Sequence, residues 1–156
     1  MPVRMLEPPT TLRVISAGFA VCAMIRGMRI EHVAVWTEDL ERLVSFYRAY
    51  FGASVGENYV NPAKGFESRF LSFDSGARLE LMRTATFSPV KHPAAAQRMG
   101  LTHLAFAIGS TEGVDELTAR LRRDGHQILD EPRRTGDGYY ESVVLDPDGN
   151  RVEITA

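Results

Sequence analysis

The sequence contains little cysteine, no long hydrophobic run and almost no excess of charge of one sign. Its single cysteine, Cys22, excludes a disulfide within the chain and a cysteine-based zinc cluster, and it fits a reducing compartment such as the cytoplasm. The longest mainly apolar stretch, residues 15–25, is too short to cross a bilayer, so we expect no membrane partner. The net charge of −2 gives no basic field that would attract nucleic acid.

The bulk composition is typical of a soluble globular protein, since 44% of the 156 residues are hydrophobic and 24% are charged. Residues 1–27 differ because they are basic and are interrupted early by Pro8 and Pro9. We expect them to form an N-terminal extension that is disordered or loosely docked, with a targeting segment as the alternative. Residues 28–156 are expected to form a single domain, with repeat one at 28–84, a linker at 85–100 and repeat two at 101–156.

Two short segments recur in the chain at nearly the same spacing. His32-Val-Ala-Val-Trp36 returns as His103-Leu-Ala-Phe-Ala107, an offset of 103 − 32 = 71, and Arg78-Leu-Glu-Leu81 returns as Arg151-Val-Glu-Ile154, an offset of 153 − 80 = 73. Around them, alternating and helical apolar patterns predict the order β-α-β-β-β in each half. One such unit would be marginal alone. The sequence therefore predicts an α+β fold in which paired βαβββ repeats form a curled mixed sheet with helices on its outer face.

Each repeat also contains one histidine and one glutamate that are out of phase with the apolar residues of their strands. These four residues, predicted to face the concave side of the sheet, are His32, Glu80, His103 and Glu153. Taken singly, such a histidine is more often a hydrogen-bonded core residue, and such a glutamate could pair with the arginine two positions before it. Their recurrence in register instead favours one divalent metal site, because two imidazoles and two carboxylates together can hold such an ion.

With these motifs the chain resembles the vicinal oxygen chelate (glyoxalase/bleomycin resistance protein/dioxygenase) superfamily over residues 28–156. The resemblance rests on residues 30–35 (IEHVAV), 78–81 (RLEL), 101–106 (LTHLAF) and 146–154 (DPDGNRVEI), and it is closest to bacterial glyoxalase I-like, or lactoylglutathione lyase-like, proteins. It implies that His32, Glu80, His103 and Glu153 bind one divalent ion. Zn²⁺ or Ni²⁺ is expected first, with Co²⁺, Mn²⁺ and Fe²⁺ as alternatives.

The resemblance further implies a metal-dependent lyase or isomerase that acts on a vicinal-oxygen substrate through a metal-bound enediolate. Glu153 would be the catalytic base and Glu80 the second candidate. The side chains expected to line a substrate pocket, with core packing as the alternative, are Trp36, Phe70, Met82 and Tyr140.

Two positions depart from the bacterial glyoxalase I pattern. Trp36 stands where that pattern has an arginine that binds the carboxylate of glutathione, and Thr84 stands where it has an asparagine. Arg69, Arg83 or Arg133 could take over the anion-binding role. The metal chemistry is therefore expected to be kept, while recognition of glutathione stays open.

Two other functions remain open at this stage. One is another enzyme of the superfamily, of epimerase or dioxygenase type, and the other is a non-catalytic drug-binding resistance protein. A small-molecule ligand and a homodimer are expected in each case. The two repeats could complete a site within one chain or between two chains.

Overall fold

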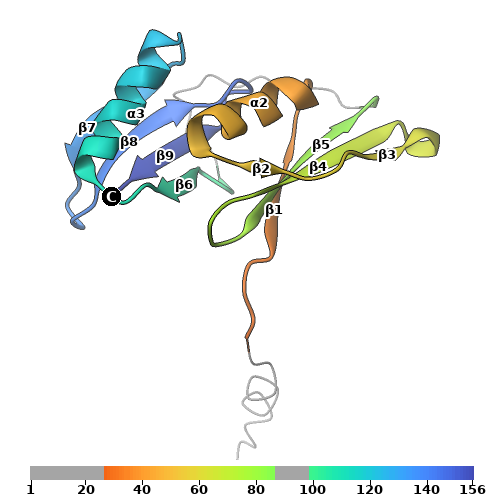
Figure 1. The fold of residues 1–156 in the computed structure, drawn as a ribbon, viewed down its shortest axis with the longest axis horizontal. Coiled ribbons are helices and arrows are strands. Elements are labelled where there is room, and N and C mark those ends of the chain that lie inside the picture. The colour runs from red at the N-terminus through yellow and green to blue at the C-terminus, as the bar shows by residue number, and fades with distance from the viewer. Residues whose placement is uncertain (1–26, 87–98) are drawn as a thin grey trace, which may run out of the picture.

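The structure, a computed structural model, describes residues 27–86 and 99–156. The first repeat contains β1 (His32–Trp36), α2 (Leu40–Phe51), β2 (Ser54–Val55), β3 (Tyr59–Asn61), the 3-10 helix η1 (Pro62–Lys64), β4 (Phe66–Ser72) and β5 (Arg78–Thr84). The second contains β6 (Leu104–Ala107), α3 (Thr111–Arg123), β7 (Ile128–Arg134), β8 (Tyr140–Leu145) and β9 (Arg151–Thr155) (Figure 1). The expected N-terminal extension and most of the expected linker lie outside the described residues. Within the two described ranges, no helix is both long and apolar enough to cross a membrane.

Helix α2 forms where apolar residues recur at helical spacing, and both of its ends are capped. The Asp39 side chain accepts a hydrogen bond from the backbone N–H of Arg42 at 3.0 Å, and Gly52 ends the helix in the left-handed conformation with φ 66°. The apolar face of α2 packs on β4 and β5, and the buried core residues that these three elements contribute include Leu40, Leu43, Val44, Tyr47, Leu71, Leu79 and Leu81. Burial of each such side chain contributes roughly 1.5–3 kcal/mol, so this contact fixes α2 on its own sheet.

The second repeat is built in the same way. Helix α3 begins after Ser110, its N-cap, whose hydroxyl accepts a hydrogen bond from the Gly113 N–H at 3.0 Å. Strand β7 continues through Pro132, at a point where its pairing with β8 is irregular. The buried face of α3 packs against β7, β8 and β9.

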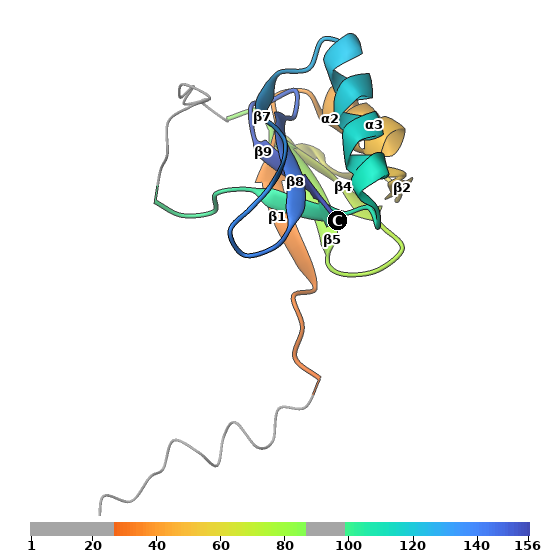
Figure 2. The same cartoon turned by 90° about the vertical axis from the view of Figure 1, so that its left-hand side faces the viewer.

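The strands form two mixed sheets with the same order in each repeat. In the first sheet β1 runs parallel to β5, and β5 is antiparallel to β4, which also pairs with β2 and β3. In the second sheet β6 runs parallel to β9, and β9 is followed by the antiparallel strands β8 and β7. Both helices lie on the same side of these strands (Figure 2). The predicted α+β fold with paired βαβββ repeats is thus confirmed, with its strands divided between two sheets.

The two repeats pack together through their helix sides. Helix α2 lies between its own sheet and the second repeat (Figure 1), and one hydrophobic cluster runs through both repeats. Within it, the ring of Phe106 contacts Phe51 and Phe73, with ring centroids 4.5 and 4.9 Å apart. Beside these rings the Tyr47 hydroxyl donates a hydrogen bond to the buried Asp146 at 3.0 Å. The sheet faces opposite the helices are therefore turned outward.

We expect the substitution Tyr47→Phe to lower the free energy of unfolding by about 1–3 kcal/mol, because the buried Asp146 carboxylate loses a donor from the other repeat. Asp146 keeps its bonds from Asp148 and Asn150, so the loss is partial. Urea unfolding measures the change, with Tyr139→Phe as the matched control because Tyr139 is 54% exposed. Equal stability of the two variants would show that the hydrogen bond adds nothing to the packing of the repeats.

Candidate metal centre

The four candidate ligands lie on the sheet faces that turn away from the helices. In β1 the residues on the His32 face are exposed, and they alternate with valines that pack against the core. Ala34 pairs in register with Glu80 across β1 and β5, and Ala105 pairs with Glu153 across β6 and β9. Since partners in adjacent strands point to the same face, each glutamate shares a face with the histidine of its repeat.

Each repeat brings one histidine and one glutamate close together. Nε2 of His32 lies 3.7 Å from Oε2 of Glu80, and Nε2 of His103 lies 3.6 Å from Oε2 of Glu153. The side chains of the two histidines are 39% and 41% exposed, and those of the two glutamates are each 16% exposed. We call His32 with Glu80 the first half-site and His103 with Glu153 the second half-site. The two half-sites are near-copies, as the repeat predicts.

The spacing within each half-site suits two ligands of one metal ion. A hydrogen bond would hold nitrogen and oxygen about 2.7–3.2 Å apart, and the observed separations of 3.6 and 3.7 Å are longer. Ligand atoms that each lie about 2.0–2.2 Å from a common ion can be separated by such distances. Imidazole nitrogen and carboxylate oxygen are also donors that Zn²⁺ and neighbouring first-row ions accept. The residues present therefore fit a divalent metal.

Within one chain the two half-sites do not come together. Among residues 27–86 and 99–156, no group of three or more His, Cys, Asp or Glu side chains is placed to hold an ion. The cause is the packing of the repeats through their helix sides, which leaves the two ligand faces on separate sheets. Among the described residues, one chain thus has two separate pairs of candidate ligands, rather than one group of four.

Glu31 and Arg78 adjoin the first half-site. Oε2 of Glu31 lies 2.5 Å from Nδ1 of His32, and Nε of Arg78 donates to Oε1 of Glu31 at 2.9 Å. The hydrogen bond with His32, and after it Arg78, holds the pKa of Glu31 below its ordinary value against the effect of desolvation. Arg78 thus pairs with Glu31 rather than with Glu80, the partner that the ion-pair alternative assigned to it. Sequence reasoning missed Glu31 because it precedes β1, where the alternation of strand faces does not apply; its place next to His32 was the available signal.

Glu141 and Arg133 adjoin the second half-site. Val143 of β8 pairs in register with Glu153, and Glu141, two residues earlier, faces the same side. Arg133 donates a hydrogen bond to Glu141 at 3.3 Å. Burial, followed by the neighbouring Glu141 carboxylate, raises the pKa of Glu153, while His103 opposes this shift. An additional carboxylate and a guanidinium therefore lie next to the second half-site.

Three of the four expected pocket residues lie on the first ligand face. Trp36 follows His32 along the exposed face of β1, Met82 pairs in register with Trp36, and Phe70 pairs with Glu80. The edge of Phe70 contacts the His32 ring, with ring centroids 5.3 Å apart. An aromatic and apolar surface therefore adjoins the first half-site.

Tyr140 lies on the opposite face of its sheet. Its hydroxyl donates to Asp115 of α3 at 2.8 Å, and Ser142, on the same face, contacts Thr118 of α3 at 2.6 Å. The expectation that Tyr140 lines a substrate pocket on the ligand face is therefore wrong, and the alternative of packing inside the repeat holds. The register of β8 on β9 places Glu141 on the ligand side, which turns Tyr140 toward the helix.

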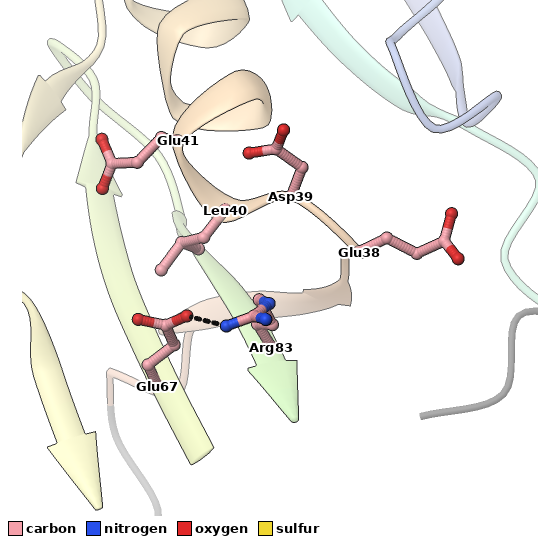
Figure 3. A pocket seen from close by; sticks show the side chains of 6 residues that line it. All are labelled: Glu38, Asp39, Leu40, Glu41, Glu67 and Arg83. Carbon is pink, nitrogen blue, oxygen red and sulfur yellow. Dashed lines mark hydrogen bonds and ion pairs between the residues drawn. The ribbon is translucent and has the colours of Figure 1, made fainter. Parts of the chain in front are cut away.

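The arginines that were candidates for anion binding are mostly on the helix side. A cleft of about 320 Å³ opens at the start of α2 (Figure 3), and it is lined by Glu38, Asp39, Leu40, Glu41, Glu67 and Arg83. Arg83 pairs at 2.6 Å with Glu67, its register partner on the neighbouring strand, and Arg69 pairs with Glu41 at 2.9 Å. Both arginines are thus held by glutamates away from the ligand face, which leaves Arg133 as the candidate beside a half-site.

Comparison with known proteins agrees with the fold. The family model of the Glyoxalase/Bleomycin resistance protein/Dioxygenase superfamily matches residues 29–154. The chain is 28% identical over 127 residues to lactoylglutathione lyase GLX1 of Arabidopsis thaliana. The matched segment covers 81% of this chain and 43% of that protein. The chain is also 40% identical to YqjT of Bacillus subtilis over 62 residues. This shorter matched segment covers 38% of this chain and 48% of that protein. The chain thus spans less than half the length of these two relatives.

A solved structure of another protein has a similar fold. The trypanothione-dependent glyoxalase I of Leishmania major superposes with a TM-score of 0.63 at 26% sequence identity. The match covers 81% of this chain and 85% of that one.

Proposed function

Because this chain belongs to the glyoxalase/bleomycin resistance protein/dioxygenase superfamily, we propose that it is a metal-dependent lyase or isomerase of glyoxalase I type. In the proposed site, His32 and Glu80 of one chain and His103 and Glu153 of a second chain hold one divalent ion. The observation that carries this proposal is the pair of matching half-sites, with two ligands each, on separate sheets of one chain.

The edges of the two sheets support assembly with a second copy of the chain. Within the described residues, β1 and β6 each pair with a single neighbouring strand, so each has an open edge beside its half-site. If β1 of one chain paired with β6 of another, the two half-sites would lie on one continuous sheet. The arrangement is isologous, because each chain would contribute its first half-site to one shared site and its second half-site to the other. Two chains would therefore form two equivalent sites.

The donors indicate what the bound ion would do. Mixed imidazole and carboxylate ligands suit Zn²⁺ and Ni²⁺, with Co²⁺, Mn²⁺ and Fe²⁺ as alternatives. When bound, the ion would act as a Lewis acid toward two neighbouring oxygens of a substrate.

The carboxylates of the chain would move the proton. We assign to Glu153 the removal of a proton from one substrate carbon and its return to the adjacent carbon, with Glu80 as the second candidate. The two glutamates have different surroundings, because Glu141 lies on the face of Glu153 and Ser68 occupies the equivalent place in the first repeat (141 − 73 = 68). This asymmetry supports a division of roles between them.

The proposed substrate class is a hemithioacetal, formed from a 2-oxoaldehyde and a thiol, because it carries two neighbouring oxygens. The names of the relatives point to thiol conjugates, but they do not fix which thiol this chain would accept. On the first ligand face, Trp36 meets the edge of Phe66 with ring centroids 6.1 Å apart, so an aromatic surface stands where glutathione recognition would need a cation. Thiols other than glutathione are therefore included in the proposal.

We expect the purified protein to contain about one divalent ion per chain in elemental analysis. The double variant His32→Ala/Glu153→Ala should contain none, because it removes one ligand from each half-site. Glu67→Ala is the matched control, since Glu67 lies on the helix side, and it should keep its metal. Absence of metal after reconstitution with Zn²⁺, Ni²⁺, Co²⁺ and Mn²⁺ would contradict the proposal and favour a non-catalytic drug-binding protein.

The metal-loaded protein should then convert hemithioacetals of methylglyoxal in a spectrophotometric assay. Glutathione and several other low-molecular-weight thiols serve as the thiol component. Conversion with one thiol and not with the others would identify the carrier. A loaded protein that converts none of them would restrict the proposal to another reaction of the superfamily.

A further inference from the structure

We propose that Glu31 is a positioning residue for the metal ligand His32, and that Arg78 holds Glu31 in place for this role. The inference rests on the proposed function in one respect, because it takes His32 to be a metal ligand. Glu31 would touch neither the ion nor the substrate. Its role is to fix which nitrogen of the His32 ring is free to bind, and where that nitrogen points.

The two ring nitrogens of His32 face two different carboxylates. Nδ1 lies 2.5 Å from Oε2 of Glu31, while Nε2 points toward Glu80, 3.7 Å away. An ionised carboxylate only accepts hydrogen bonds, so in the neutral imidazole the contact with Glu31 favours the tautomer with its proton on Nδ1. The lone pair of the ring then lies on Nε2, which is the nitrogen that an ion in the first half-site requires. Glu31 thus selects the tautomer of His32 before any ion arrives.

Arg78 keeps the Glu31 carboxylate in this position. Nε of Arg78 donates to Oε1 of Glu31 at 2.9 Å and Nη2 donates to the same oxygen, which leaves Oε2 for His32. The Arg78 backbone N–H also donates to the Glu31 carbonyl at 3.0 Å. The guanidinium lies 4.1 Å over the ring of Phe70, which His32 contacts edge-on. Carboxylate, guanidinium and imidazole are therefore held around one ring, and rotation of any one of them breaks contacts of the others.

The second repeat keeps the arginine, because Arg151 stands where Arg78 stands (151 − 78 = 73), but it has neither the carboxylate nor the aromatic ring. Thr102 stands where Glu31 stands (102 − 31 = 71), and Val143 is in register with Glu153 where Phe70 is in register with Glu80. A threonine hydroxyl carries no charge, and valine has no ring for a guanidinium to cover. The outer carboxylate is therefore a property of the first half-site, and it is not a requirement of the sheet architecture.

The test uses the full chain and two substitutions of Glu31. In the metal-free protein, ¹⁵N NMR of the histidine rings reports the tautomer; competition titration with a chromophoric chelator reports the affinity for Zn²⁺. We expect Glu31→Ala to change His32 from one Nδ1-protonated form to a mixture of tautomers and to weaken Zn²⁺ binding by about tenfold or more. Glu31→Gln keeps an acceptor oxygen and loses the charge, so it should keep the tautomer and lose less affinity.

The control is Glu67→Gln, which removes another glutamate paired with an arginine of the same sheet, on the helix side. It should change neither readout. An unchanged His32 tautomer in Glu31→Ala would overturn the inference, as would a Zn²⁺ affinity within twofold of a wild-type protein that binds zinc. A wild-type protein that binds none of Zn²⁺, Ni²⁺, Co²⁺ and Mn²⁺ would instead remove the proposed function, while the tautomer of the metal-free protein still decides the role of Glu31.

Discussion

A heterodimer of two metal-free variants should recover one metal ion. One variant carries His32→Ala and Glu80→Ala and has no first half-site, and the other carries His103→Ala and Glu153→Ala and has no second half-site. If each site is shared between two chains, either variant alone forms only incomplete sites. In the mixed dimer, the intact first half-site of one chain meets the intact second half-site of the other. Elemental analysis should then give about one ion per heterodimer, against about two for the wild-type dimer.

Two affinity tags, one on each variant, allow the heterodimer to be purified from the mixture. Size-exclusion chromatography before the metal measurement establishes that each sample is a dimer. If each site were completed within a single chain, every site of the heterodimer would lack two ligands, and no metal would be recovered. That result, in a wild-type protein that does bind metal, would contradict the shared site and leave the metal chemistry intact.

Glu153→Gln should lower turnover by about 10²–10⁴-fold, the usual contribution of a general base, while the protein keeps its metal. The amide oxygen of glutamine still occupies the position of a ligand, and the other three ligands are unchanged. The amide cannot accept a proton at neutral pH, so the step assigned to Glu153 is lost. The measurement is kcat at saturating substrate in protein whose metal content has been determined in parallel.

Glu80→Gln is the matched comparison, because Glu80 occupies the equivalent position in the first half-site with the same exposure of 16%. We expect it to retain more activity than Glu153→Gln. The reverse order would assign the base to Glu80. Nearly normal turnover in both variants would remove proton transfer by the ligand glutamates from the mechanism.

Patterns within each repeat were enough to predict its local structure. Alternation of two residues predicted the faces of β1, β5, β6 and β9, and it placed His32 and Glu80 on one face, as the register of Ala34 with Glu80 shows. The same pattern failed for Tyr140, which packs on α3 through Asp115. Tyr140 is the first residue of β8, so no earlier residue of that strand indicates to which face of the sheet its side chain points.

The relation between the repeats could not be predicted in the same way. It depends on contacts between residues far apart in the chain, such as Tyr47 with Asp146 and the rings of Phe51 and Phe106. Each of these residues fits its own strand, helix or turn in several arrangements of the two repeats. The pattern of one repeat therefore carries no signal for the face on which the other repeat packs.

The open edges of β1 and β6 also bear on how the chain avoids aggregation. An exposed strand edge is a template on which further chains can add without limit, and natural proteins cover or interrupt such edges. Here both edges belong to one chain, on sheets whose relative position is set by α2 and the aromatic contacts beneath it. Reciprocal pairing in a dimer would cover both edges of both chains at once, so that growth stops at two. By bridging the two half-sites, a bound ion would then also favour the closed pair over open-ended polymers.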